Sequence, residues 1–207
     1  IAEKIRTLGR RALVVPCDVN EPGALEALVD RTVAEFGRID IVVNNAGGTP
    51  PRGALQTSDR MFEAAFHFNV TTAFTLSRHA IPHMQKAGSG SIVNISSAAG
   101  RVPQANFVAY GTAKAALSFM TRQLAAEFAP VVRVNAIAVG AVKTSALMPF
   151  LNDDLRHAME KLTPMKRLGE VEDIATMALY LASPASSWVT GKVFEVDGGT
   201  EATNWPS

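Results

Sequence analysis

The sequence predicts an α/β fold: a doubly wound parallel sheet in a single domain covering residues 1–207. Two observations lead to this prediction. Apolar runs rich in Val and Ile recur along the chain without polar alternation, and segments with helical periodicity separate them. Strands of a parallel sheet have continuous apolar sequences because crossover helices bury both of their faces.

The composition fits one globular domain. Of the 207 residues, 47% are hydrophobic and 19% are charged, which allows a sizeable core. The net charge of +1 provides no basic field for nucleic acid, and no apolar run approaches the roughly 20 residues of a membrane span. Cys17 is the single cysteine, so no internal disulfide can form. We therefore expect a cytoplasmic protein with no nucleic-acid or membrane partner.

The first third of the chain is expected to contain two helices and two strands. Residues 1–9 have the pattern of the end of an amphipathic helix, and residues 11–19, including Cys17, form a continuous apolar strand. A helix follows from Asn20 to Gly37, with Pro22 in the first turn, where proline is tolerated. Residues 39–44 are the next apolar strand.

Three small residues, Asn45, Ala46 and Gly47, follow this strand. They would lie at the carboxyl edge of the parallel sheet, where open α/β sheets bind ligands, and they would let the backbone approach a ligand closely. A plain glycine turn explains the same residues equally well. The pattern alone leaves both interpretations open.

A long helix is expected from about Ser58 to Lys86, with a kink or late break at Pro82. It contains Asn69, a residue of poor helix propensity that is usually tolerated on a surface. His79 and His83 have the spacing of a metal pair, but no third ligand accompanies them. We therefore expect no metal site.

The stretch from Ser91 to Lys114 contains the candidate catalytic residues. A short strand and a loop of small residues precede an Ala-rich helix that carries Tyr110 and Lys114 one turn apart, on one face. A phenol with a pKa near ~10 becomes a useful acid and base at neutral pH only when a nearby cation favours its anion. Lys114 would be that cation. Ser97, at the end of the strand, could bind the oxygen of the substrate.

The Tyr–Lys spacing is a weak signal by itself, because such pairs are common on solvated helix faces. With Ser97, Asn69 and the sequence NNAG at 44–47, however, the chain resembles the short-chain dehydrogenase/reductase family from about Asp18 to Gly199. The resemblance implies a Rossmann-type fold and a nicotinamide cofactor, NAD or NADP. It also implies a Ser–Tyr–Lys–Asn catalytic set, here Ser97, Tyr110, Lys114 and Asn69.

The resemblance further implies where the cofactor would bind. Asp18 would cap the adenine amino group with Val19 beside it, while Lys114, next to Tyr110, would hold the ribose. Asn69 would hold a water and extend a proton relay behind Lys114. The remaining cofactor contacts are Asn45, Ala46 and Gly47 on the adenosine half, and Val142 and Thr144 on the nicotinamide carboxamide. Val139 replaces the proline that usually precedes the glycine at 140, so a slightly altered loop with intact function is expected.

The last part of the chain is expected to alternate helices and strands. The helix that carries Tyr110 continues to about Phe128, and the later elements are a strand at 131–138, a helix at 170–181, a strand at 192–196 and a turn at 197–199. The tail EATNWPS suggests no element. Residues 145–165 form an apolar segment containing Ala146, Leu147, Met148, Phe150, Leu151 and Met159. It is interpreted either as a mobile substrate lid or as a helix pair packed on the core.

No Gly-rich strand-to-helix turn, which would bind a pyrophosphate, precedes Asn44. We therefore expect the 207 residues to be a fragment that lacks an N-terminal strand–helix–strand unit, including the residue that selects NAD or NADP. In the family's strand order 3-2-1-4-5-6, the missing strands would lie between the strand at 11–19 and the strand at 39–44. Their absence would leave two apolar edges unpaired.

The function expected from this resemblance is hydride transfer between a nicotinamide cofactor and a secondary alcohol or ketone. The small-molecule substrate would be largely apolar, of hydroxysteroid, sugar or acyl type. Pairing of the Ser58 and Tyr110 helices would form a homodimer or homotetramer. One alternative is a truncated, catalytically silent interaction protein, and another is a family member that epimerises or dehydrates its substrate.

Overall fold

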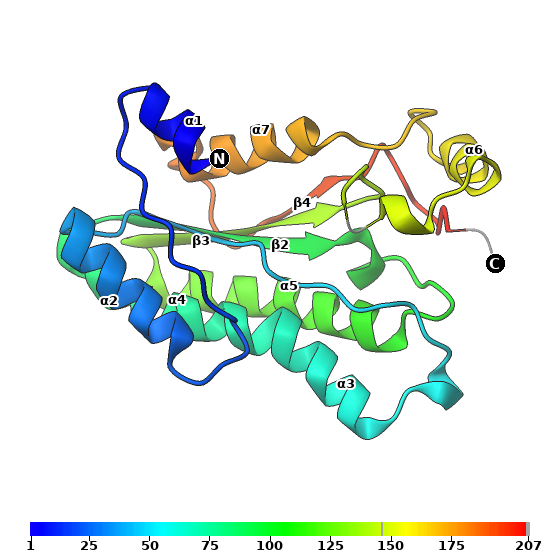
Figure 1. Cartoon of the computed structure of the whole chain (residues 1–207), viewed down its shortest axis with the longest axis horizontal. Helices are drawn as coiled ribbons and strands as arrows, with labels where there is room; N and C mark the ends of the chain where they lie inside the picture. Colours follow the sequence, from blue (N-terminus) through cyan, green and yellow to red (C-terminus); the bar gives the residue numbers. More distant parts are fainter. Residues whose placement is uncertain (146, 206–207) are drawn as a thin grey trace.

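The computed structural model describes residues 1–145 and 147–205, and its centre is a four-stranded parallel sheet between two helical layers (Figure 1). The strands follow one another in chain order across the sheet, so each neighbouring pair requires a crossover connection. The strands are β1 (Ile41–Asn44), β2 (Gly90–Ser97), β3 (Val132–Val139) and β4 (Val193–Val196). The register pairs Ser97 with Val139, so the ends of β2 and β3 lie side by side.

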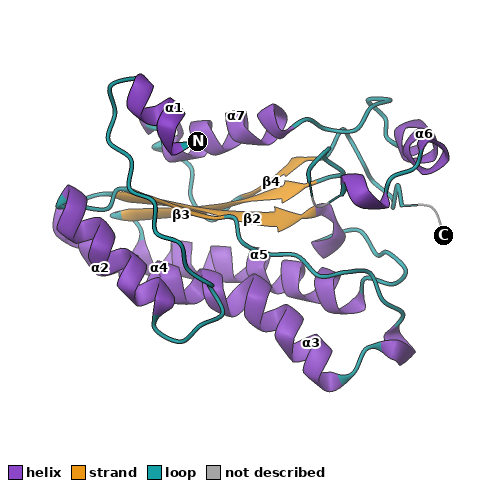
Figure 2. Ribbon diagram, viewed as in Figure 1, coloured by secondary structure: helices purple, strands orange, loops and turns teal. Residues whose placement is uncertain are grey.

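Helices cover the two faces of the sheet unequally (Figure 2). One face carries α2 (Ala24–Phe36), α4 (Thr72–Ala87) and α5 (Val108–Phe128), with α3 (Asp59–Phe66) packed against α5. The other face carries α7 (Val171–Ala182), and the short α1 (Ala2–Thr7) lies on the same side. Near the carboxyl end of the sheet lies α6 (Asp153–Leu162).

The core has one apolar layer on each face of the sheet. Successive strand residues point to opposite faces, so Ile92 packs toward α4 while Val93 packs toward Leu181 of α7. Ile92, Val93 and Leu181 are fully buried. Burial on both sides confirms the parallel sheet predicted from the unbroken apolar runs.

The predicted strand at residues 11–19 does not form. The segment has no partner strand, Val14 is 58% exposed, and Cys17 is exposed rather than buried in a strand. An apolar run becomes a strand only where a neighbouring backbone can pair with it. In the described part of the chain no strand pairs with the outer side of β1, which is an edge strand of the sheet.

The helix predicted at 58–86 exists, but it is interrupted at Asn69 and does not break at Pro82. A π-helical segment, His67–Thr71, separates α3 from α4, and α4 continues past Pro82 to Ala87. The Asn69 side chain donates to the Ala65 carbonyl at 2.8 Å. A regular helix would reserve this carbonyl for the backbone N–H of Asn69, so the inserted amide widens the turn.

The other predicted elements agree with the structure to within a few residues. Gly37, with a left-handed φ of 81°, is the C-cap of α2, and Glu170 is the N-cap of α7, where it forms a capping box with Asp173. The segment at 145–165 contains a 3₁₀ turn, Met148–Phe150, and α6, while Ala146 lies outside the described residues. No helix in this described part of the chain combines the length and apolar composition that crossing a bilayer requires.

Candidate active site

The first turn of α5 is pressed against the turn that follows β2. A Cβ atom on Gly111 would lie 2.7 Å from the Ala99 carbonyl oxygen, and one on Gly100 would lie 2.8 Å from the Ala115 nitrogen. Only glycine permits this approach at either position. The close packing brings Tyr110 of α5 to Ser97, the last residue of β2, where both line one cavity.

Lys114 lies one turn after Tyr110 and is only 3% exposed. Its Nζ donates to the Ile95 carbonyl at 2.8 Å and lies 5.7 Å from the centroid of the Tyr110 ring. Burial disfavours the ammonium form and lowers the pKa of Lys114 to about 8. The structure therefore holds a lysine that can gain or lose a proton near neutral pH.

Burial also sets the proton affinity of Tyr110. Removal from water raises the pKa of the phenol, and the nearby Ser97 hydroxyl acts in the opposite direction. The sequence predicted that Lys114 would lower this pKa, but the net shift has the opposite sign. The physical reason is that burial disfavours the phenolate and also weakens the charge of Lys114, which points to the Ile95 carbonyl.

The buried lysine makes stability depend on pH. Above about pH 8 the folded lysine is neutral, whereas in the unfolded chain it stays charged up to about 10.4, so the unfolded state binds more protons. Stability should therefore rise with pH in this window. Relative to Lys114→Met, the wild type should gain about 1 to 2 kcal/mol in free energy of unfolding between about pH 8 and about pH 9.5.

Urea unfolding of both proteins at the two pH values measures this difference. The exposed Lys86, at the end of α4, supplies the matched control Lys86→Met, which should follow the wild type. An identical pH dependence in the wild type and Lys114→Met would contradict the lowered pKa.

Asn69 fixes the loop that follows β1. Its Oδ1 accepts the N–H of Gly48 at 2.8 Å, and its Nδ2 donates to the Gly48 carbonyl at 3.1 Å. A Cβ atom on Gly47 would lie 2.8 Å from Asn69 Oδ1 and 2.9 Å from Lys114 Nζ. The structure thus places Asn69 and Gly47 beside Lys114, whereas the water relay through Asn69 stays a prediction.

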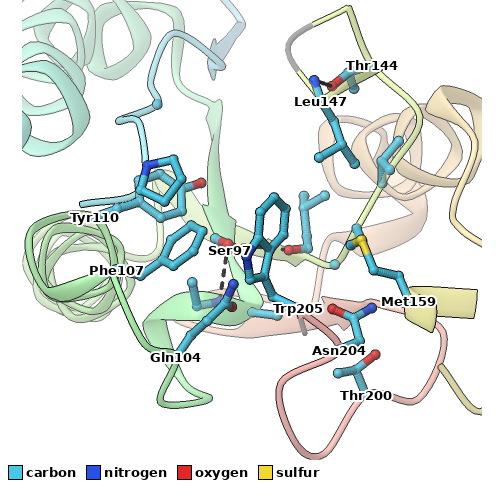
Figure 3. A pocket seen from close by; sticks show the side chains of 18 of the residues that line it. Ser97, Gln104, Phe107, Tyr110, Thr144, Leu147, Met159, Thr200, Asn204 and Trp205 are labelled. Atoms are coloured by element: carbon cyan, nitrogen blue, oxygen red, sulfur yellow. Dashed lines mark hydrogen bonds between the residues drawn. The ribbon is translucent and has the colours of Figure 1, made fainter. Parts of the chain in front are cut away.

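A cavity of about 450 Å³ opens in front of Tyr110 (Figure 3). Ser97, Val142 and Thr144, predicted as site residues, line it with Tyr110. Sequence reasoning missed several more lining residues, among them Gln104, Phe107, Asn204 and Trp205. The only signal for the last two was a tryptophan in an otherwise polar tail, because nothing local in the sequence places that tail against the sheet.

The cavity suits the nicotinamide end of the expected cofactor. Val142 and Thr144, which the sequence predicted to contact the nicotinamide carboxamide, border it. Asn45, Ala46 and Gly47 are exposed beyond the end of β1, where they would meet the adenosine half.

The two residues predicted to contact the adenine, Asp18 and Val19, lie apart from the cavity. Asp18 and Val19 do not line the cavity, and the Asp18 carboxylate accepts from the backbone N–H and side-chain amide of Asn20. Because residues 11–19 do not join the sheet, strand register does not fix Asp18 at the carboxyl edge.

This site defines a class of enzyme. A partly buried phenol, a lysine one turn away and a serine hydroxyl meet at the carboxyl ends of parallel strands, beside an uncharged cavity. Among described residues, no group of acidic, His or Cys side chains could hold a metal ion. A tyrosine placed in this way can donate or accept a proton, and the arrangement fits an oxidoreductase in which a dinucleotide takes or gives a hydride.

Comparison with known proteins identifies the family. Residues 1–201 match the family model described as enoyl-(acyl carrier protein) reductase. An uncharacterized oxidoreductase of Mycobacterium tuberculosis is 51% identical over 99% of this chain and 78% of its own length. A 7α-hydroxysteroid dehydrogenase of Escherichia coli is 38% identical over 96% of this chain and 78% of its own. A solved 7α-hydroxysteroid dehydrogenase, complexed with NADH and 7-oxo glycochenodeoxycholic acid, superposes with a TM-score of 0.92 at 38% identity, covering 96% of this chain and 78% of that one.

The chain belongs to the short-chain dehydrogenase/reductase family. It is an NAD(P)-dependent oxidoreductase that transfers a hydride between the cofactor and a secondary alcohol or ketone. The relatives are oxidoreductases, so they do not favour the catalytically silent alternative.

Proposed function

We propose that the substrate is an uncharged or weakly polar ring compound with a secondary hydroxyl or a ketone on the ring. The observation that carries this proposal is the cavity in front of Tyr110. Its walls are mainly apolar and aromatic, and none of its described lining residues carries a charge. A pocket of this kind favours an alicyclic skeleton over a phosphorylated sugar or an acyl thioester, whose charges would lose water without gaining partners. The 7α-hydroxysteroid dehydrogenase relative has a substrate of this class by its name.

In this proposal Tyr110 moves the hydroxyl proton and Ser97 orients the reacting oxygen. The Ser97 hydroxyl accepts the Ala99 N–H at 3.2 Å and donates only weakly to the Val139 carbonyl, at 3.5 Å. That long contact leaves its proton available to a substrate oxygen. When bound, the nicotinamide supplies or accepts the hydride.

The other predicted roles are part of the same proposal. Lys114 would hold the ribose, and Asn69 would anchor the relay behind it. The cofactor contacts are Asp18 and Val19 at the adenine, Asn45, Ala46 and Gly47 at the adenosine half, and Val142 and Thr144 at the carboxamide. Residues 145–165 would act as the substrate lid, which is supported by Leu147 and Met159 lining the cavity.

We also propose a homodimer or homotetramer in the cytoplasm. Phe74 of α4 is 41% exposed and Phe119 of α5 is 57% exposed, and such large apolar groups on neighbouring helices support pairing with a second copy. The single cysteine supports a reducing compartment.

The test is a screen of the full-length protein with NAD and with NADP, followed through the absorbance of the reduced nicotinamide. We expect oxidation of single-ring and polycyclic secondary alcohols with one of the two cofactors. Sugar phosphates and acyl thioesters of matched concentration should be poor substrates. Efficient turnover of the charged substrates, with none of the ring alcohols, would contradict the proposal.

A further inference from the structure

The C-terminal segment, residues 197–205, closes one side of the cavity. Asp197 begins it, with a side chain only 5% exposed, and its Oδ1 accepts the N–H groups of Gly199 at 2.9 Å and Thr200 at 3.2 Å. The Thr200 hydroxyl donates back to the Asp197 carbonyl at 2.8 Å. These bonds build a compact turn that directs the rest of the segment toward the cavity.

Arg101 ties this segment to the loop that follows Ser97. Its guanidinium donates to the Thr200 carbonyl at 2.6 Å. It also pairs with three carboxylates, those of Glu195 at 3.0 Å, Asp197 at 3.3 Å and Glu201 at 2.9 Å. The planar guanidinium can satisfy several acceptors at once, which a lysine cannot do in the same geometry. Arg101 therefore holds together, through several hydrogen bonds and ion pairs, two segments that are far apart in the chain.

Trp205 completes a row of three aromatic rings. Its ring meets Phe107 edge to face, with centroids 5.8 Å apart, and Phe107 meets Tyr110 in the same way at 6.1 Å (Figure 3). Next to it, Asn204 Nδ2 donates to the hydroxyl of Thr163, a buried residue at the end of α6. The segment thus touches both walls of the cavity, the loop before α5 and the segment that contains α6.

We propose that Trp205 is a specificity-determining residue for extended ring substrates and that Arg101 is the residue that positions it. This inference rests on the proposed function of the same cavity. A tryptophan ring offers a broad apolar face to a polycyclic skeleton at little entropic cost, and a small single-ring substrate does not reach across the cavity to use it. Contacts of this kind change discrimination between substrates about 10- to 200-fold.

The first test compares Trp205→Ala with Trp188→Ala in the full-length protein. Trp188 is 98% exposed and does not line the cavity, which makes it a matched control. The ratio of kcat/KM for a polycyclic alcohol to that for cyclohexanol should fall about 10- to 100-fold in Trp205→Ala, mainly through KM. It should stay unchanged in Trp188→Ala. An equal ratio in the two variants would overturn the role of Trp205.

The second test follows the position of Trp205 without relying on turnover. In a Trp188→Phe background, Trp205 is the one tryptophan of this sequence that still fluoresces. Arg101→Gln should increase quenching of its emission by acrylamide, and Arg101→Lys should restore only part of the protection. Arg38→Gln, which removes an exposed ion pair with Asp40 at 2.6 Å, is the control and should leave quenching unchanged. Equal quenching in Arg101→Gln and Arg38→Gln would overturn the role of Arg101.

The proposed function and the role of Trp205 in specificity can be contradicted separately. If the wild type oxidises no secondary alcohol with either cofactor, the proposed function fails, while the quenching comparison still decides the role of Arg101. If the wild type oxidises ring alcohols and the Trp205→Ala ratio is unchanged, the specificity inference alone fails.

Discussion

Tyr110→Phe is expected to lower kcat about a hundred- to ten-thousand-fold, because it removes the hydroxyl that carries the proton. The ring itself should stay in place, since its edge-to-face contact with Phe107 needs no hydroxyl. Cofactor affinity should therefore change little. Titration of the fluorescence of the reduced nicotinamide measures binding, and steady-state turnover of a ring alcohol measures catalysis.

Tyr180→Phe is the matched control for this experiment. The sequence contains two tyrosines, and Tyr180 lies on α7, outside the cavity and 38% exposed. Its variant should retain wild-type turnover. If Tyr110→Phe also kept most of its turnover, another group would have to carry the proton and the role of Tyr110 would be refuted.

Gly140→Ala should be the most disruptive of the small substitutions around the site. A Cβ atom there would lie 2.5 Å from the Asp197 Cα, 2.7 Å from its Cβ and 3.1 Å from its carbonyl carbon. Neither backbone can simply retreat, because Gly140 donates its N–H to the Val196 carbonyl at 3.0 Å. The free energy of unfolding should fall by about 1 to 3 kcal/mol, the usual cost of overpacking.

Urea unfolding measures this loss, and Gly53→Ala serves as its control. At Gly53 the nearest atom to a new Cβ is the end of the flexible Gln56 side chain, which can move away. We expect that variant to unfold at nearly the wild-type urea concentration. If Gly140→Ala unfolded at the same urea concentration as the wild type, the turn at Asp197 could move to accommodate the new methyl group. That result would also contradict a rigid hold of this turn on the C-terminal segment.

The regular part of the fold was predictable because its determinants are local or periodic. Strands such as β2 are buried on both faces and therefore read as continuous apolar runs. Residues 11–19 read in the same way, yet they form no strand, because pairing depends on a neighbour that the run itself does not specify. The π segment was missed for a similar reason: the Asn69 amide competes for a helix carbonyl only because the loop at Gly48 holds it there.

In the candidate site, too, the features set by local sequence were predictable and those set by distant contacts were not. Tyr110 and Lys114 share a helix face, so their spacing predicts their proximity, and the end of the preceding strand brings Ser97 to them. The sign of the pKa shift at Tyr110 depends on how much water the fold removes, which spacing does not reveal. Trp205 joins the cavity through contacts with residues about 100 positions away, and no local pattern encodes such a contact.

The π segment at His67–Thr71 determines which side chains of α3 and of α4 point in the same direction. A π turn contains one more residue than the α turn it replaces. The side-chain pattern of α4 is therefore shifted by one residue relative to that of α3. Deleting a single residue there would restore an uninterrupted α-helix and rotate one half relative to the other by about 100°. Either Asn69 would leave the Gly48 loop or α4 would turn its apolar face away from the sheet. The length of this short segment is therefore as strictly constrained as the identity of the residues around it.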